Sequence, residues 1–82
     1  MQVTVLFFAA ARDAVGHAQV EVALPESIHH AAGLLEWLGG RFPALLPHLG
    51  CLRIAHNERF VQERIDLKSG DILAIIPPVA GG

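Results

Sequence analysis

The only cysteine of the 82-residue chain, Cys51, is flanked by His48 and His56. A thiol beside an imidazole is the nucleophile of many acyl-transfer enzymes, so a self-sufficient thiol enzyme is one hypothesis for this chain. Cys51 directly precedes an apolar segment that begins at Leu52, and cysteine is among the residue types most often buried. We therefore expect Cys51 to be a small core residue, and the thiol enzyme is the weaker hypothesis.

The five histidines lack the spacing of a helical metal site, in which two ligands are four residues apart. His29 and His30 are adjacent, so on a helix their side chains would point roughly 100° apart. The acidic side chains offer no better pair, because charged turn residues are normally solvated: Glu58 and Glu63 flank an expected turn region, and Asp66 and Asp71 belong to expected turns. We predict no metal site and no catalytic carboxylate pair.

Composition excludes several classes of partner. Six Lys and Arg residues, scattered along the chain, face eight Asp and Glu residues, which argues against nucleic acid. No apolar stretch approaches the roughly 20 residues that span a bilayer, so no membrane partner is expected. Neither a P-loop nor a G-x-G-x-x-G is present, so we expect no cofactor bound by this chain. A single cysteine allows no intrachain disulfide and favours a reducing, cytoplasmic location.

The C-terminal segment is the strongest candidate for chemistry. Pro77 and Pro78 favour a stiff extended stem, and after Val79 and Ala80 the last two residues are both glycine. Bare Gly81-Gly82 backbone can enter a channel too narrow for any Cβ atom. The α-carboxylate of Gly82 is ionised at pH 7, because its reference pKa is about 3.3 to 3.7, and a carboxylate is a poor acyl electrophile. We expect activation as an acyl-adenylate by a partner that brings ATP.

The elements that carry this tail are predicted in the order ββαβββ. The sequence indicates an α+β fold, with a mixed sheet crossed by one main helix, a domain over residues 1–76 and a tail over 77–82. Alternation and β-branched residues predict five strands, at residues 2–9, 19–24, 52–56, 59–61 and 72–76. Residues 44–50 are expected to connect helix and sheet with about one helical turn. Asn57 and Gly70 suit positive φ angles in turns.

The main helix is predicted to begin at Ile28, with Ser27 as its N-cap, and to stop at Gly39-Gly40. Its apolar residues recur at spacings of three and four, as one helical stripe requires: Ile28, Ala31, Leu35, Leu38 and Phe42, widened by Leu34 and Trp37.

One helix covers one face of a sheet, yet residues 3–8 and 72–76 are apolar at positions that face both sides. The second face is then either a partner interface or covered by loops such as residues 44–50.

Four segments resemble the MoaD/ThiS sulfur-carrier family, to which the small subunit of molybdopterin synthase belongs. They are V-L-F-F-A and the following arginine at residues 5–12, Asn57 in its turn, L-x-x-G-D at residues 67–71, and above all P-P-V-A-G-G at residues 77–82. The resemblance spans the whole chain, and its most specific part is the Pro-Pro-x-x-Gly-Gly ending. It departs at Ile72, His56 and Ile76, where the family usually has other residue types.

The resemblance implies a ubiquitin-like β-grasp fold and a function. An E1-like enzyme would adenylate Gly82 with ATP, and the terminus would become a thiocarboxylate. The tail would then enter the active site of the large synthase subunit, which supplies the catalytic side chains, and give its sulfur to cyclic pyranopterin monophosphate in molybdenum cofactor biosynthesis. A heterotetramer of two small and two large subunits is implied. By position, the family's partner contacts fall on these residues: Phe8, Arg12, Phe60, Ile76 and the tail Pro77, Pro78, Val79 and Ala80.

Two alternatives share the Gly-Gly end. One is a sulfur carrier for another pathway, such as thiamine, cysteine or tRNA thiolation. The other is a ubiquitin-like protein modifier or adaptor, in which the same terminus forms isopeptides with lysine side chains.

Overall fold

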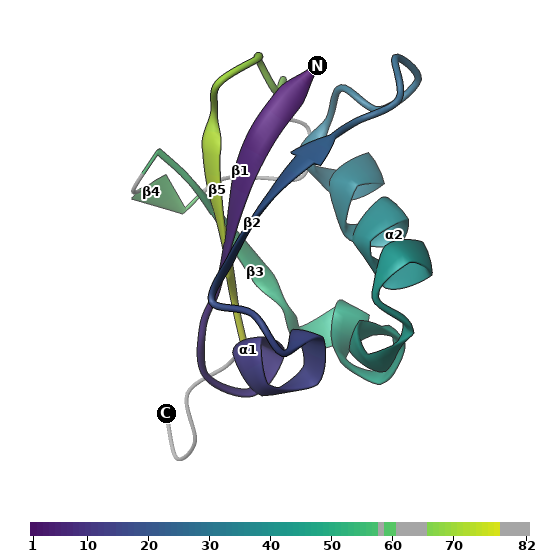
Figure 1. Ribbon diagram of the computed structural model, residues 1–82, viewed down its shortest axis with the longest axis vertical. Helices are drawn as coiled ribbons and strands as arrows, with labels where there is room; N and C mark the ends of the chain where they lie inside the picture. Colours follow the sequence, from purple (N-terminus) through teal and green to yellow (C-terminus); the bar gives the residue numbers. More distant parts are fainter. Residues whose placement is uncertain (58, 61–65, 78–82) are drawn as a thin grey trace.

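A computed structural model describes residues 1–57, 59–60 and 66–77 of the chain (Figure 1). The elements follow in the order β1 (Gln2–Phe7), α1 (Ala9–Val15), β2 (Gln19–Ala23), α2 (Ala31–Arg41), the 3₁₀ helix η1 (Pro43–Cys51), β3 (Arg53–His56), β4 (Arg59–Phe60) and β5 (Ile72–Ile76). No helix among these described residues is long and apolar enough to cross a membrane.

The five strands form one mixed sheet in the order β2-β1-β5-β3-β4. β1 and β5 pair in parallel at its centre, and the other neighbours are antiparallel. The mixed sheet and the main helix that crosses it confirm the predicted β-grasp architecture, but helix α1 between β1 and β2 is absent from the predicted ββαβββ order.

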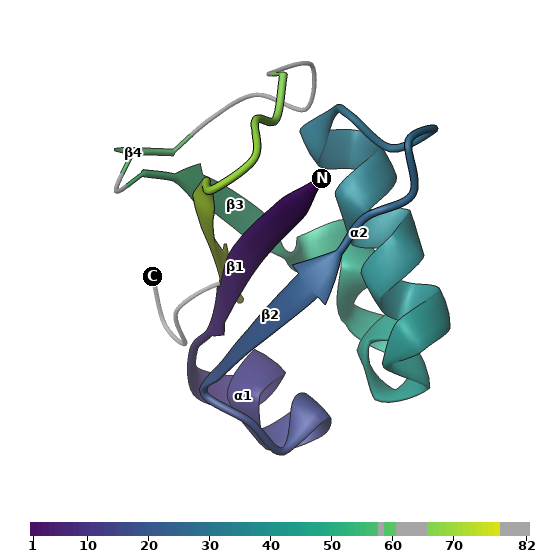
Figure 2. The ribbon, with the colours of Figure 1, turned by 45° about the horizontal axis from the view of Figure 1, so that its top comes forward.

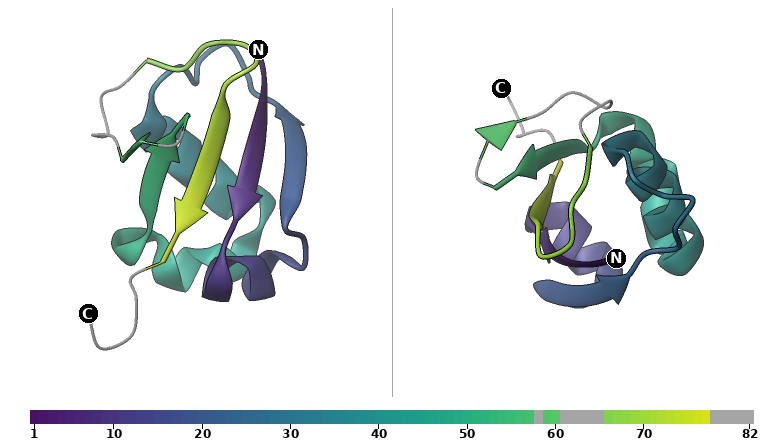
Figure 3. Two further views of the ribbon diagram at one scale, coloured as in Figure 1. Left: turned by 90° about the vertical axis from the view of Figure 1, so that its left-hand side faces the viewer. Right: turned by 90° about the horizontal axis from the view of Figure 1, so that it is seen from above.

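The helices occupy one side of the sheet. In the left view of Figure 3 the strands face the viewer and α2 and η1 lie behind them; Figure 2 shows α2 running across that side. The core lies between these layers, where strand side chains such as Phe7 and Ile75 meet Leu34 and Leu38 of α2. The ring of Phe42 packs edge-on against that of Phe7, with centroids 5.7 Å apart.

The connector over residues 44–50 does not cover the second face of the sheet. It is part of η1, which packs against α2, and its Leu45 is fully buried in the core. The alternative in which this loop shields the apolar second face is therefore wrong. Over the described residues, that face stays open.

Two helix boundaries differ from expectation. The first strand ends at Phe7 because Ala9, at a positive φ of 49°, turns the chain into α1, which the sequence did not predict. Helix α2 begins at Ala31, three residues later than expected, because the N–H of Leu67 donates to the carbonyl of His29 and keeps this stretch extended. Ser27 consequently caps nothing.

The predicted turn residues are confirmed. Asn57 and Gly70 both adopt positive φ angles, of 49° and 89°. Strand β5 ends at Ile76, as expected. The boundary between domain and tail stays a prediction, because residues 78–82 lie outside the described part of the chain.

Candidate docking face and chain terminus

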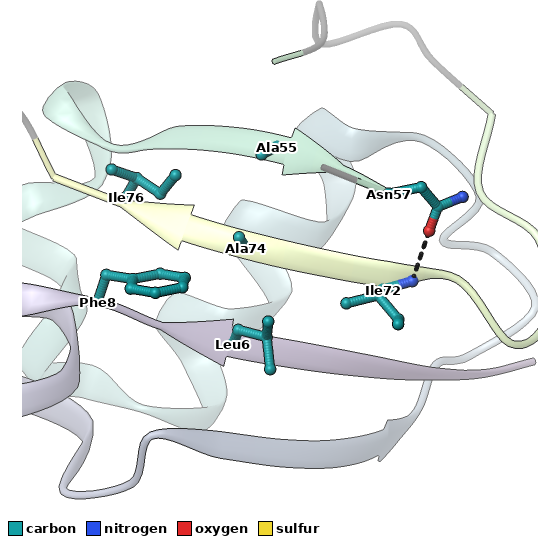
Figure 4. Close-up of a pocket in the computed structure, with 7 residues that line it drawn as sticks. All are labelled: Leu6, Phe8, Ala55, Asn57, Ile72, Ala74 and Ile76. Carbon is teal, nitrogen blue, oxygen red and sulfur yellow. Dashed lines mark hydrogen bonds between the residues drawn. The ribbon is translucent and has the colours of Figure 1, made fainter. Parts of the chain in front are cut away.

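The open face of the sheet carries an apolar hollow of about 620 Å³. Figure 4 shows it across β1, β5 and β3, lined by Leu6, Phe8, Ala55, Asn57, Ile72, Ala74 and Ile76. Phe8 and Ile72 are 46% and 47% exposed, although both are large apolar residues. A contiguous exposed apolar surface of this kind is typical of interaction sites.

The alternation of strand side chains explains how the hollow forms. In β5, Leu73 and Ile75 point into the core and are fully buried, so the residues between them point to the open face. Ala74 of β5 and Ala55 of β3 lie opposite each other in register at the centre of this face. Their small side chains leave room that the larger residues around them do not fill.

Asn57 fixes one end of the hollow. Its side-chain Oδ1 accepts a hydrogen bond of 3.0 Å from the N–H of Ile72, drawn as the dashed line in Figure 4, and its own N–H donates to the Ile72 carbonyl over 2.9 Å. Asparagine tolerates the left-handed backbone that this requires. Both backbone groups of Ile72 are thereby held by one residue, which sets where the exposed Ile72 side chain stands.

A polar network is formed by the two residues that precede Asn57 and Ile72 in the sequence, His56 and Asp71. Nε2 of His56 lies 2.6 Å from Oδ2 of Asp71, and their side chains are only 18% and 12% exposed. The N–H of Lys68 donates to the same oxygen over 2.8 Å. Burial alone would raise the pKa of the Asp71 carboxyl, but the hydrogen bonds from His56 and Lys68 outweigh it, so that pKa is lowered. Asp71 is therefore no solvated turn residue, contrary to expectation.

The structure places only part of the predicted partner surface. Phe8 and Ile76 line the hollow, and Arg12 is exposed on α1, at the end of the sheet where β1 and β5 finish (Figure 1). Pro77 follows directly after Ile76 and is half-buried. The backbone of Phe60 pairs with Ala55 in the sheet, while its side chain and residues 78–82 lie outside what the structure describes.

Two further side-chain predictions were wrong. Cys51 is exposed, because it ends η1 and the buried position passes to Leu52. His29 and His30 precede α2 and do not lie on it; their ring centroids are 4.3 Å apart. The geometric reason given against a metal site, that their side chains diverge on a helix, is thus removed.

Sequence reasoning did not single out five of the residues that line the hollow: Leu6, Ala55, Asn57, Ile72 and Ala74. The signal for Leu6 and Ala74 was present, because both occupy alternate positions in strands that are apolar on two sides. Ala55 needed the register between β3 and β5, which depends on contacts distant in sequence.

Comparison with known proteins places the chain in a family. The model of the ThiS family matches residues 5–82. A molybdopterin synthase sulfur carrier subunit of Drosophila yakuba is 45% identical over 100% of this chain and 92% of its own length.

Solved structures agree in fold. A protein of Pyrococcus furiosus described as putative molybdopterin converting factor, subunit 1, is 29% identical and superposes with a TM-score of 0.83 over 96% of this chain and 99% of that one. A chain in a Helicobacter pylori complex of subunits 1 and 2 of molybdopterin-converting factor has a TM-score of 0.71 and 25% identity, over 100% of both chains. The protein described here belongs to the ThiS family.

Proposed function

We propose that this chain is the sulfur carrier subunit of a molybdopterin synthase, and that Gly82 holds the sulfur as a thiocarboxylate. The observation that carries the proposal is the continuity of hollow and tail: Ile76 lines the hollow, and Pro77 is the next residue. In a complex with a partner docked on the hollow, the tail therefore begins at a fixed position beside that partner. The names of the Drosophila and Helicobacter relatives support the same assignment.

The terminus takes part in three steps. The Gly82 carboxylate attacks the α-phosphate of ATP in an E1-like partner, releasing pyrophosphate and forming an acyl-adenylate. Hydrosulfide released by a sulfur donor then attacks the acyl carbon, so that a C–S bond forms, the bond to AMP breaks, and a thiocarboxylate remains. The sulfur passes to cyclic pyranopterin monophosphate while water returns an oxygen to Gly82. The chain binds no cofactor of its own in this scheme, and Gly81 gives the terminus steric access to the narrow sites of its partners.

The proposed partners are the large synthase subunit, in a heterotetramer of two small and two large chains, and the E1-like adenylating enzyme. Both would contact the open face, where Phe8 and Ile76 offer apolar area beside the exposed Arg12. A cytoplasmic location belongs to the same proposal.

Intact mass spectrometry tests the chemistry. The full chain is incubated with the cognate adenylating enzyme, Mg-ATP and a sulfur donor, and we expect a mass gain equal to the replacement of one oxygen by sulfur. A chain lacking Gly82 should fold normally but show no such gain. Failure of the intact chain to gain this mass would refute the thiocarboxylate.

Two matched substitutions test the docking face. Ile72→Lys places a charge on the hollow, whereas Leu46→Lys changes an equally large residue, 55% exposed, on η1 at the other side of the molecule. Burying a whole apolar side chain of this size contributes about 1.5 to 3 kcal/mol, and about half of the Ile72 side chain is exposed and available for burial by a partner. Losing that half and burying a charge in its place should weaken large-subunit binding at least about tenfold. Equal weakening of binding by both variants, measured by calorimetry, would contradict the proposal that the large subunit docks on the hollow.

The same preparations separate the alternatives. Sulfur transfer to an acceptor other than the pyranopterin, with the thiocarboxylate formed, indicates a carrier for another pathway. Isopeptide conjugates in a cell lysate, without thiocarboxylate, indicate a protein modifier.

A further inference from the structure

Two imidazoles and a carboxylate meet at the end of the sheet where β1 begins. The ligand atoms of His29, His30 and Asp66 all lie within 4.8 Å of one another, and all three residues are exposed. Nδ1 of His30 lies 3.0 Å from Oδ1 of Asp66. Over the described residues, no other group of three or more histidine, cysteine, aspartate or glutamate side chains is gathered in this way.

The backbone beneath these side chains is tied in place. His30 and Asp66 form an antiparallel bridge, and the N–H of Leu67 donates to the carbonyl of His29 over 2.8 Å. The carbonyl of His30 accepts from the N–H of Leu34 in the first turn of α2, over 3.1 Å. Two segments distant in sequence, the one that leads into α2 and the one that leads into β5, are therefore joined before any ligand arrives, so a ligand need only order side chains.

The donor set selects a class of ion. Imidazole nitrogens suit Zn²⁺, Cu²⁺ and Ni²⁺, whereas Mg²⁺ and Ca²⁺ prefer oxygen donors alone. Zn²⁺ bonds to histidine and carboxylate at about 2.0 to 2.2 Å, which puts tetrahedral ligand atoms about 3.4 Å apart. The His30 and Asp66 atoms are already that close. A separation of 4.8 Å shortens to this value by rotation of exposed side chains about their χ angles.

We propose that His29, His30 and Asp66 bind a divalent transition-metal ion of the Zn²⁺ class, with water as the fourth ligand. The bound ion joins the segment before α2 to the segment that leads into β5. Because the unfolded chain does not gather these three side chains, binding stabilises the folded state. The site lies at the opposite end of the sheet from Pro77, the root of the tail (Figure 1). It is thus independent of the proposed sulfur chemistry.

The probe is ZnCl₂ added to the full chain after treatment with a chelator. Calorimetry should show one equivalent of Zn²⁺ bound, and Co²⁺ in its place should give the visible absorption of a tetrahedral site. Loss of even an outer-sphere partner of a metal ligand costs about 10- to 100-fold in affinity, so Asp66→Asn and His29→Ala should each weaken binding about tenfold or more. All the altered residues are exposed, and circular dichroism verifies that each variant is folded.

Matched controls remove other exposed donors: His17→Ala, His48→Ala and Cys51→Ser. Each should bind Zn²⁺ as the unaltered chain does. The proposal is overturned if the unaltered chain takes up no Zn²⁺. It is equally overturned if the Asp66 and His29 variants keep the affinity, or if a control variant loses it.

Discussion

Replacing Asp71 with asparagine should destabilise the fold by an amount that can be worked from its contacts. Oδ2 of Asp71 accepts from the His56 ring and from the N–H of Lys68, at 2.6 and 2.8 Å, in a site largely shielded from water. Hydrogen bonds to a charged group contribute about 1.5 to 3 kcal/mol each and are roughly twice as strong as neutral ones. Asparagine retains neutral bonds only, so we expect a loss of about 2 kcal/mol.

For a domain of this size about 1 kcal/mol corresponds to roughly 4 to 8 °C in Tm, so Asp71→Asn should melt about 8 to 16 °C lower at pH 7. The matched control is Asp66→Asn in the presence of a chelator. It removes the same kind of aspartate–histidine contact, but from a carboxylate that is 75% exposed. Exposed ion pairs contribute about 0 to 1 kcal/mol, so this variant should stay close to the unaltered chain.

The pH dependence supplies a second readout. The folded-state pKa of Asp71 lies below its ordinary value of 3.8. Its ionised form therefore stabilises the fold in full above that pH, and the stabilisation is lost as the pH falls through the folded-state pKa. Urea unfolding should show the gap between Asp71→Asn and the unaltered chain narrowing below about pH 4. A gap below about 0.5 kcal/mol at pH 7, or one that persists at low pH, would refute the assignment of this contact.

Three further predictions concern the backbone and the core. Gly40→Ala should raise the free energy of unfolding in urea by up to about 1 kcal/mol, because an added Cβ meets nothing within 4 Å. Gly39→Ala should raise it less, because its Cβ would lie 2.8 Å from the Leu46 side chain. Equal gains for the two variants would contradict that packing. Ala9→Gly should raise stability by about 0.5 to 1 kcal/mol by relieving a positive φ, and a lower Tm would speak against strain there. Leu38→Ala, at a fully buried site, should cost about 2 to 5 kcal/mol, and a cooperative transition near that of the unaltered chain would count against the core described here.

Local chemistry explains what sequence alone could predict. Strand β5 was bounded correctly because Gly70 must turn the chain before it and a proline follows it. The apolar stripe of the main helix can be predicted because its spacing of three and four residues is a local property of the sequence and does not depend on contacts with distant residues. The open face followed from an imbalance in composition, since one helix cannot cover two apolar faces of a sheet.

The remainder depended on contacts between distant residues. Helix α1 is short, and it starts at Ala9 with a positive φ angle, which alanine rarely adopts and which the sequence therefore does not indicate. The start of α2 was shifted by a hydrogen bond from Leu67, far along the chain. The same pairing brings Asp66 to His30, and the pairing of β3 with β5 brings His56 to Asp71, so neither contact could be found from spacing in the sequence.

The position of β5 also governs when the fold can form during translation. It lies between β1 and β3, yet the ribosome makes it after the other four strands. A nascent chain that stops short of Ile72 has no central strand, so β1 and β3 have nothing to join them and the docking face does not exist. Folding must wait for non-local pairing, which makes it slow relative to local helix formation. Truncated products therefore lack both the hollow and the root of the tail, because β5 supplies the middle of the hollow and Pro77 follows β5 directly.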